Sequence, residues 1–220
     1  MQGVPEFGRD VAQLLGGGVL LLALLGLRQR RRMALVKVLA AQAAMLAAAI
    51  AWQGSVRDEP GLYVAALLAF GLRAVLVPAA LRRLALSHGL PPTAATNPAL
   101  GPGMMLALAV AAVGAAAMVA QTADVGSGAA LSREDLALAL AVTLLGLLGM
   151  AARRDGIGQA TGLMGVESGV ILAAASAAGM PMLIGILVAL TAMTALALAT
   201  VHLRHQLDEA LATPKRRVEE

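Results

Sequence analysis

Residues 157–179, IGQATGLMGVESGVILAAASAAG, show most clearly the pattern from which the fold can be predicted. Their length matches the roughly 20 residues that a helix needs to cross a hydrocarbon core of ~30 Å. Glu167 is the only ionisable residue among them. A continuous apolar segment of this length predicts a membrane-spanning helix, and the rest of the chain follows the same pattern.

Six further apolar runs have a similar length, and the charged and turn residues fall between them. These runs are 11–27, 34–52, 62–86, 100–121, 131–152 and 181–203. With 59% hydrophobic residues and a mean hydropathy of +0.80, the chain could not cover such an apolar core with a polar shell. The predicted fold is therefore all-α, a polytopic transmembrane bundle of about seven helices in the lipid bilayer.

Basic residues predict the orientation of this bundle. If the N-terminus lies outside, the inner segments carry thirteen of them, the outer segments three (Arg9, Arg57 and Arg133), and one lies within a span. The inner set is Arg28, Arg30, Arg31, Arg32, Lys37, Arg82, Arg83, Arg153, Arg154, Arg204, Lys215, Arg216 and Arg217. The positive-inside rule then places the C-terminus in the cytoplasm and the chain in the inner cell membrane. An even number of helices would scramble the pattern.

Along the chain we expect four parts. They are an N-terminal three-helix part (1–99), two central helices (100–156), a C-terminal helix pair carrying Glu167 (157–206) and a charged cytoplasmic tail (207–220).

Composition also excludes several classes of function. The chain has no cysteine, which rules out disulfides, iron–sulfur ligation and thiolate zinc sites. His88, His202 and His205 form no ligand set with a carboxylate, so no metal or cofactor is expected. The high pI reflects arginines that set topology, and nucleic acid is not an expected partner.

Two charged residues lie where charge is costly. Arg73 is 11 residues past Leu62, and Glu167 is 10 residues past Ile157, so both lie near the bilayer midplane. Each would cost about 2.5–3.5 kcal/mol there if unpaired, and for this reason intramembrane charges usually serve function. A structural alternative is that the two neutralise each other at similar depth. Pro78, five residues after Arg73, predicts a kink in that helix.

The helix that carries Glu167 has a stripe of glycines on its opposite face. Gly158, Gly162, Gly165 and Gly169 recur at spacings of four, three and four residues. Such small-residue patterns let a second helix approach closely. We therefore expect one face of this helix to pack and the other to present the acid.

Part of the sequence resembles a known family. Residues 153–157 (RRDGI) and 162–169 (GLMGVESG) are similar to component E of energy-converting hydrogenases of the hydrogenase-4 and formate hydrogenlyase type. The last three helices look like the small proton-channel subunit of respiratory complex I. The segment 72–78 (LRAVLVP) resembles a second family stretch that has a lysine at the position of Arg73.

This resemblance implies an oxidoreductase subunit without a redox centre of its own, in a complex-I-like membrane arm with other membrane subunits as partners. Glu167 would exchange protons and Arg73 would modulate it. The sequence departs from the family where further acids are common, at Gly185 and Thr191. Waters near Thr191 and Thr194 could bridge the gap, or a partner could supply the acid, or the subunit does not conduct.

Three alternative functions remain open at this stage. A purely structural membrane subunit would not need the charge of Glu167. An antiporter subunit would differ mainly in its partners, and an independent small-solute or cation carrier would be expected to show internal repeats. A stand-alone enzyme is disfavoured, because the sequence shows no nucleophile–base pair, metal cluster or phosphate loop.

Overall fold

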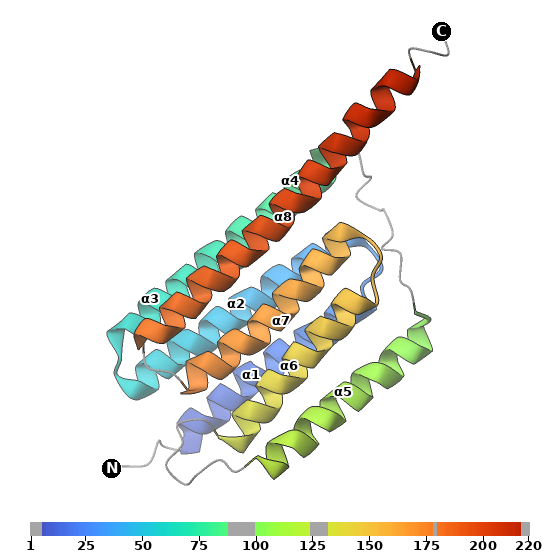
Figure 1. Cartoon of the computed structure of the whole chain (residues 1–220). Helices are drawn as coiled ribbons and strands as arrows, with labels where there is room; N and C mark the ends of the chain where they lie inside the picture. The colour runs from blue at the N-terminus through green and yellow to red at the C-terminus, as the bar shows by residue number, and fades with distance from the viewer. Residues whose placement is uncertain (1–5, 88–99, 124–131, 178–179, 217–220) are drawn as a thin grey trace.

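The computed structural model describes residues 6–87, 100–123, 132–177 and 180–216, and these residues contain helices but no strands (Figure 1). The helices are α1 (Glu6–Arg28), α2 (Arg32–Arg57), α3 (Pro60–Ala69), η1 (Phe70–Leu76), α4 (Val77–Ser87), α5 (Pro102–Thr122), α6 (Arg133–Ala151), α7 (Gly156–Ala177) and α8 (Met180–Arg216). Because α3, η1 and α4 follow one another without a break, the described chain forms seven continuous helical segments.

All seven segments are long and apolar enough to cross a membrane, which indicates a multi-pass membrane protein. The predicted all-α class and the predicted helix number are thus confirmed. Most observed helix ends lie within a few residues of the apolar runs. The exception is α8, which continues to Arg216, whereas its apolar run ends at 203. Residues 207–212 are mostly good helix formers, so part of the expected tail extends this helix.

Local chemistry accounts for the ends of several helices. Asp58 closes α2 in the left-handed conformation (φ 53°, ψ 40°), and its N–H donates to the Gly54 carbonyl. Aspartate tolerates this conformation better than most residues, and it turns the chain directly into Pro60 at the start of α3. Ser132 caps α6 by accepting a hydrogen bond from the Asp135 N–H at 3.0 Å.

Pro78 is accommodated by a π-helical segment, where the sequence predicted a kink. The N–H of Val77 donates to the carbonyl of Leu72, five residues earlier, and residues Phe70–Leu76 form the wide turn of η1. Proline has no N–H and clashes with the carbonyl four residues before it, which here is Ala74. A local change of hydrogen-bond register lets the helix continue past this position.

The helices pack with α6 and α7 in the most extensive contact. The helices α1 and α2 lie beside this pair, α5 covers the outer side of α6, and α3, α4 and α8 lie on the other side of the bundle (Figure 1). Buried leucine, isoleucine, valine and alanine side chains from α1, α2, α3, α6, α7 and α8 form the main core. Helices that are distant in sequence therefore share one core around α7.

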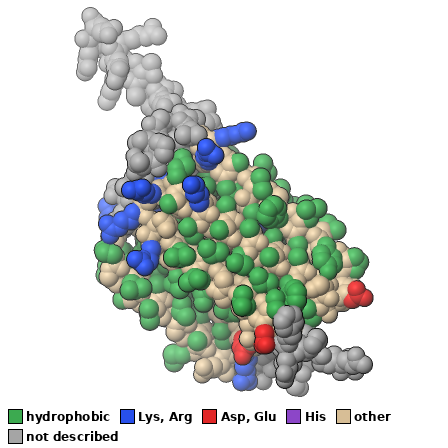
Figure 2. Space-filling model, turned by 180° about the vertical axis from the view of Figure 1, so that it is seen from behind, with side chains coloured by type: hydrophobic (Ala, Val, Ile, Leu, Met, Phe, Trp, Pro, Cys, Tyr) green, Lys and Arg blue, Asp and Glu red, His purple; other side chains and the backbone are tan. Residues whose placement is uncertain are grey.

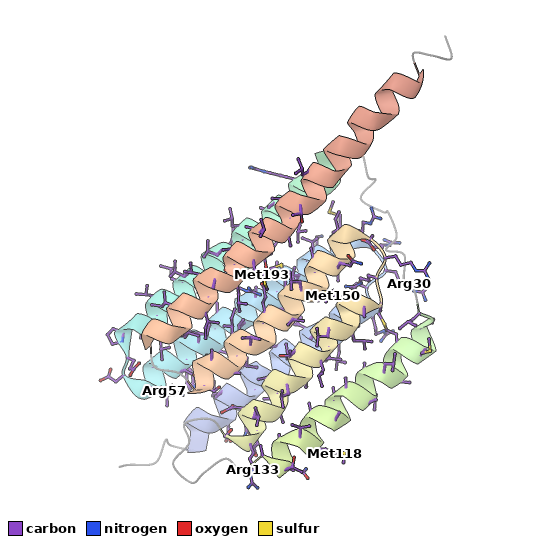
Figure 3. The ribbon with its side chains drawn as sticks, viewed as in Figure 1. Arg30, Arg57, Met118, Arg133, Met150 and Met193 are labelled. Atoms are coloured by element: carbon purple, nitrogen blue, oxygen red, sulfur yellow. The ribbon has the colours of Figure 1, made fainter. Side chains whose placement is uncertain are left out.

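Charged side chains gather at the two ends of this bundle. Figure 2 shows Lys and Arg side chains at one end of an otherwise apolar surface and acidic side chains at the opposite end. The helix directions place Arg28, Arg82 and Arg153 at the first end, which we call the arginine-rich end. Arg57 and Arg133 lie at the other end. Figure 3 labels Arg57 and Arg133 there. This segregation agrees with the predicted alternation, while its cytoplasmic orientation stays a prediction.

Candidate functional site: a buried charge pair between three helices

Arg73 and Glu167 form a salt bridge inside the bundle. Arg73 Nη1 donates to Glu167 Oε2 at 2.6 Å, and the two side chains are only 1% and 0% exposed. Arg73 comes from η1 and Glu167 from the middle of α7. The sequence predicted only that the two residues lie at a similar depth, and the structure shows that their side chains are in direct contact.

The guanidinium of Arg73 makes further contacts with α7. Its Nη2 donates to the Met164 carbonyl at 3.0 Å and to Ser168 Oγ at 3.3 Å. The buried Nε has no hydrogen-bond partner among the described protein atoms. The sequence reasoning did not assign Ser168 a role, although it directly follows Glu167 in the quoted motif.

The second oxygen of Glu167 is bound from α8. Thr194 Oγ1 donates to Glu167 Oε1 at 2.5 Å, and Thr194 is itself 1% exposed. Both carboxylate oxygens are thus engaged, one by a cation and one by a hydroxyl. The site therefore joins the third, sixth and seventh membrane-spanning segments.

The two threonines singled out on α8 differ. Thr194 touches the carboxylate, whereas Thr191 Oγ1 donates to the Leu187 carbonyl of its own helix at 2.7 Å and is half-buried. Gly185, where the family that the sequence resembles commonly carries an acid, is exposed, and a Cβ there would contact nothing within 4 Å. Only Thr194 therefore belongs to the site.

Three of the four predicted packing glycines lie against α6. A Cβ on Gly162 would lie 2.6 Å from Met150 Cα, one on Gly165 would lie 3.0 Å from Gly146 Cα, and one on Gly169 would lie 2.6 Å from Thr143 N. Helix α7 thus packs on α6 through one face and holds Glu167 on the other, as predicted.

Gly158 has a different neighbour from the one expected. A Cβ there would meet Arg153 and Asp155 of the turn between α6 and α7, and its N–H donates to Asp155 Oδ2 at 2.9 Å. Gly158 has these neighbours because it lies in the first turn of α7, and the connection between α6 and α7 folds back over this end of the helix. The partner glycines Gly146 and Gly149 on α6 were missed, although their i, i+3 spacing was visible in the sequence.

A second polar cluster lies in that same turn. Arg153 is 4% exposed, and its guanidinium donates to the Gly26 carbonyl at 2.8 Å and to Thr161 Oγ1 at 3.2 Å. Burial lowers the pKa of Arg153 from its usual value, and the carboxylate of Asp155 opposes this shift. An arginine stays protonated under these conditions, so Arg153 ties the ends of α1, α6 and α7 together as a cation.

No cluster of three or more metal-ligating side chains occurs among the described residues. His88 and the side chains of His202 and His205 lie outside the described part of the chain.

The fold and the site together define a multi-pass α-helical membrane protein with an enclosed Arg–Glu–Thr cluster at its centre. Comparisons with models of known families, with curated proteins and with solved structures found no match.

Proposed function

We propose that the chain is a membrane-arm subunit of a hydrogenase-like or complex-I-like oxidoreductase, forming part of a proton path or its scaffold. The observation that carries the proposal is the Glu167 carboxylate, 0% exposed and held by Arg73 and Thr194. An ionisable group at this depth is expensive and usually functional. The resemblance of residues 153–157 and 162–169 to hydrogenase-4 component E supplies the class of assembly.

In this function Glu167 would take up and release a proton, while Arg73 would hold the carboxylate in place as the neighbouring positive charge. A proton leaving or entering Glu167 must exchange with a donor that the described residues do not supply. No other acid lies between residues 160 and 201. A partner subunit or bound water would therefore complete the route.

The scaffold is a second candidate, and the closure of the site favours it. Both carboxylate oxygens are occupied, and the two hollows described beside α1 are lined by neither Arg73 nor Glu167. A fully paired buried charge such as Glu167 can hold η1, α7 and α8 together without moving a proton. An antiporter subunit or an independent carrier would use the same cluster with different partners.

Partner identity is the first test. The tagged chain is purified in mild detergent and all bound proteins are identified. Nickel–iron hydrogenase and antiporter-like subunits in the eluate would support the assembly. A chain recovered alone and monodisperse would overturn the subunit proposal in favour of a carrier.

Proton movement is the second test, and it needs a variant in which the helices around the site stay packed. Arg73→Gln/Glu167→Gln removes both charges together, so no uncompensated charge remains in the core. If this double variant assembles but loses coupled proton uptake into membrane vesicles, conduction through Glu167 is supported. If it assembles and transports as the unaltered complex does, the scaffold role stands.

A further inference from the structure

A cleft of about 730 Å³ opens between the end of α1 and the start of α5. Its volume lies within the roughly 300–1,000 Å³ that small-molecule sites usually have. The walls are apolar side chains from the two helices, namely Leu21, Leu24 and Leu25 on α1 and Met105, Leu106 and Ala109 on α5. The cleft exists because α5 packs mainly on α6 and touches α1 only lightly.

The same cleft is basic at one end. Arg28, Arg30 and Arg153 line it, and no carboxylate is among its described lining residues. Arg28 and Arg30 are exposed, while Arg153 is 4% exposed and held by Gly26 and Thr161. Figure 3 places Arg30 at the arginine-rich end, near the start of α5.

Polarity changes along the cleft in the way that a membrane lipid changes along its length. From Arg28 to Leu21 the helix rises about 10 Å toward the membrane interior. Leu21 and Leu106 are 59% and 60% exposed, so the apolar part is open to lipid from the side. Guanidinium groups bind phosphate through paired, charge-assisted hydrogen bonds, and basic pockets between membrane helices bind anionic head groups.

We propose that this cleft binds an anionic phospholipid. Its phosphate pairs with Arg28 and Arg30 at the membrane surface, and an acyl chain lies along the leucines of α1 and α5. The lipid would cover the gap between α1 and α5, so that α5 is held against the bundle through it. Lipid binding in this cleft would require neither proton transport nor any particular partner of the chain.

The test uses the purified full chain in detergent, with lipid binding followed by native mass spectrometry. Phosphatidylglycerol is compared with phosphatidylcholine of the same acyl chains, and we expect it to bind about tenfold more tightly or better. Arg28→Gln/Arg30→Gln should remove this preference. Arg82→Gln/Arg83→Gln is the matched control, because these exposed arginines lie at the same end on α4 and should leave binding unchanged.

A steric pair of variants tests the apolar part of the site. Gly103 lines the cleft, and a Cβ there contacts nothing within 4 Å, so Gly103→Phe should fill the cleft without disturbing α5. Gly114 is equally open, belongs to the same helix and does not line the cleft. We expect Gly103→Phe to lower phosphatidylglycerol binding about tenfold or more and Gly114→Phe to leave it unchanged.

Equal binding of the two lipids would overturn the proposal. So would an unchanged preference for phosphatidylglycerol in both Arg28→Gln/Arg30→Gln and Gly103→Phe. A variant that fails to give a monodisperse peak is replaced by Arg28→Ala/Arg30→Ala or by Gly103→Leu, for which the same two outcomes decide.

Discussion

At the scale of single residues, the pairing of Arg73 with Glu167 accounts for two charges that the membrane would otherwise exclude. A buried salt bridge adds little net stability, because both ions lose their hydration. Removing one partner destabilises the fold strongly, since the other charge is left alone in an apolar core. This asymmetry allows the role of each charge to be measured.

Glu167→Gln should destabilise the chain by about 3–5 kcal/mol, because Arg73 then lacks a countercharge. Arg73→Gln/Glu167→Gln should recover most of this loss. Thermal unfolding of the purified variants in one detergent gives the comparison. Equal stability of Glu167→Gln and the unaltered chain would show that the salt bridge is absent in the membrane protein.

Thr194→Val should cost about 1.5–3 kcal/mol, because it removes a hydrogen bond to a buried carboxylate and keeps the shape of the side chain. Thr194→Ser restores the hydroxyl and should recover stability. Thr191→Val is the control, since the Thr191 hydroxyl bonds only to its own helix. A loss at position 191 as large as that at 194 would contradict this assignment.

At the scale of helices, α7 combines a packing face and a charged face, and this arrangement was predictable. The glycine spacing and the 100° turn per residue place Glu167 opposite the stripe, as the contacts with α6, η1 and α8 confirm. The contact between Arg73 and Glu167 was not predictable, because depth defines only one coordinate. Likewise, both threonines of α8 had suitable chemistry, and only the packing of α8 separates Thr194 from Thr191.

The close approach of α6 and α7 can be tested at Gly162. Gly162→Leu should separate the two helices and abolish the folded, monodisperse protein, because even a Cβ would lie 2.6 Å from Met150 Cα. Gly185→Leu on α8 should be tolerated, since that position is open. Size-exclusion chromatography in detergent distinguishes the two, and a folded Gly162→Leu protein would contradict the packing described above.

At the scale of the whole molecule, the described residues contain seven helical segments that are long and apolar enough to cross a membrane. Apolar runs and interrupting charges sufficed to predict the number of spans and nearly all their boundaries. They did not reveal that α8 continues to Arg216, because the hydropathy pattern ends where the helix leaves the apolar region. Its 37 residues span about 55 Å, well beyond a ~30 Å hydrocarbon core.

The predicted orientation has a direct measurement. A green fluorescent protein fused to the C-terminus should fluoresce, and an alkaline phosphatase fused there should be inactive, because the arginine-rich end is expected to face the cytoplasm. Fusions to the segment between α2 and α3, beside Arg57, should give the opposite pattern. Active phosphatase at the C-terminus would reverse the orientation of the whole bundle.

The wide turn η1 also links the salt bridge of Arg73 to the proline that follows it. A π-type turn holds one residue more than the α-helix on either side of it, as an inserted residue would. Deleting Gly71, which is exposed and contacts nothing through a Cβ, should therefore remove the extra residue of η1 and bring back the clash between Pro78 and the preceding helical turn, so that the helix kinks there. Arg73 lies within η1, so the same deletion would also change the direction in which its side chain leaves the helix. The passage of the helix beyond Pro78 and the salt bridge to Glu167 therefore depend on the same seven residues.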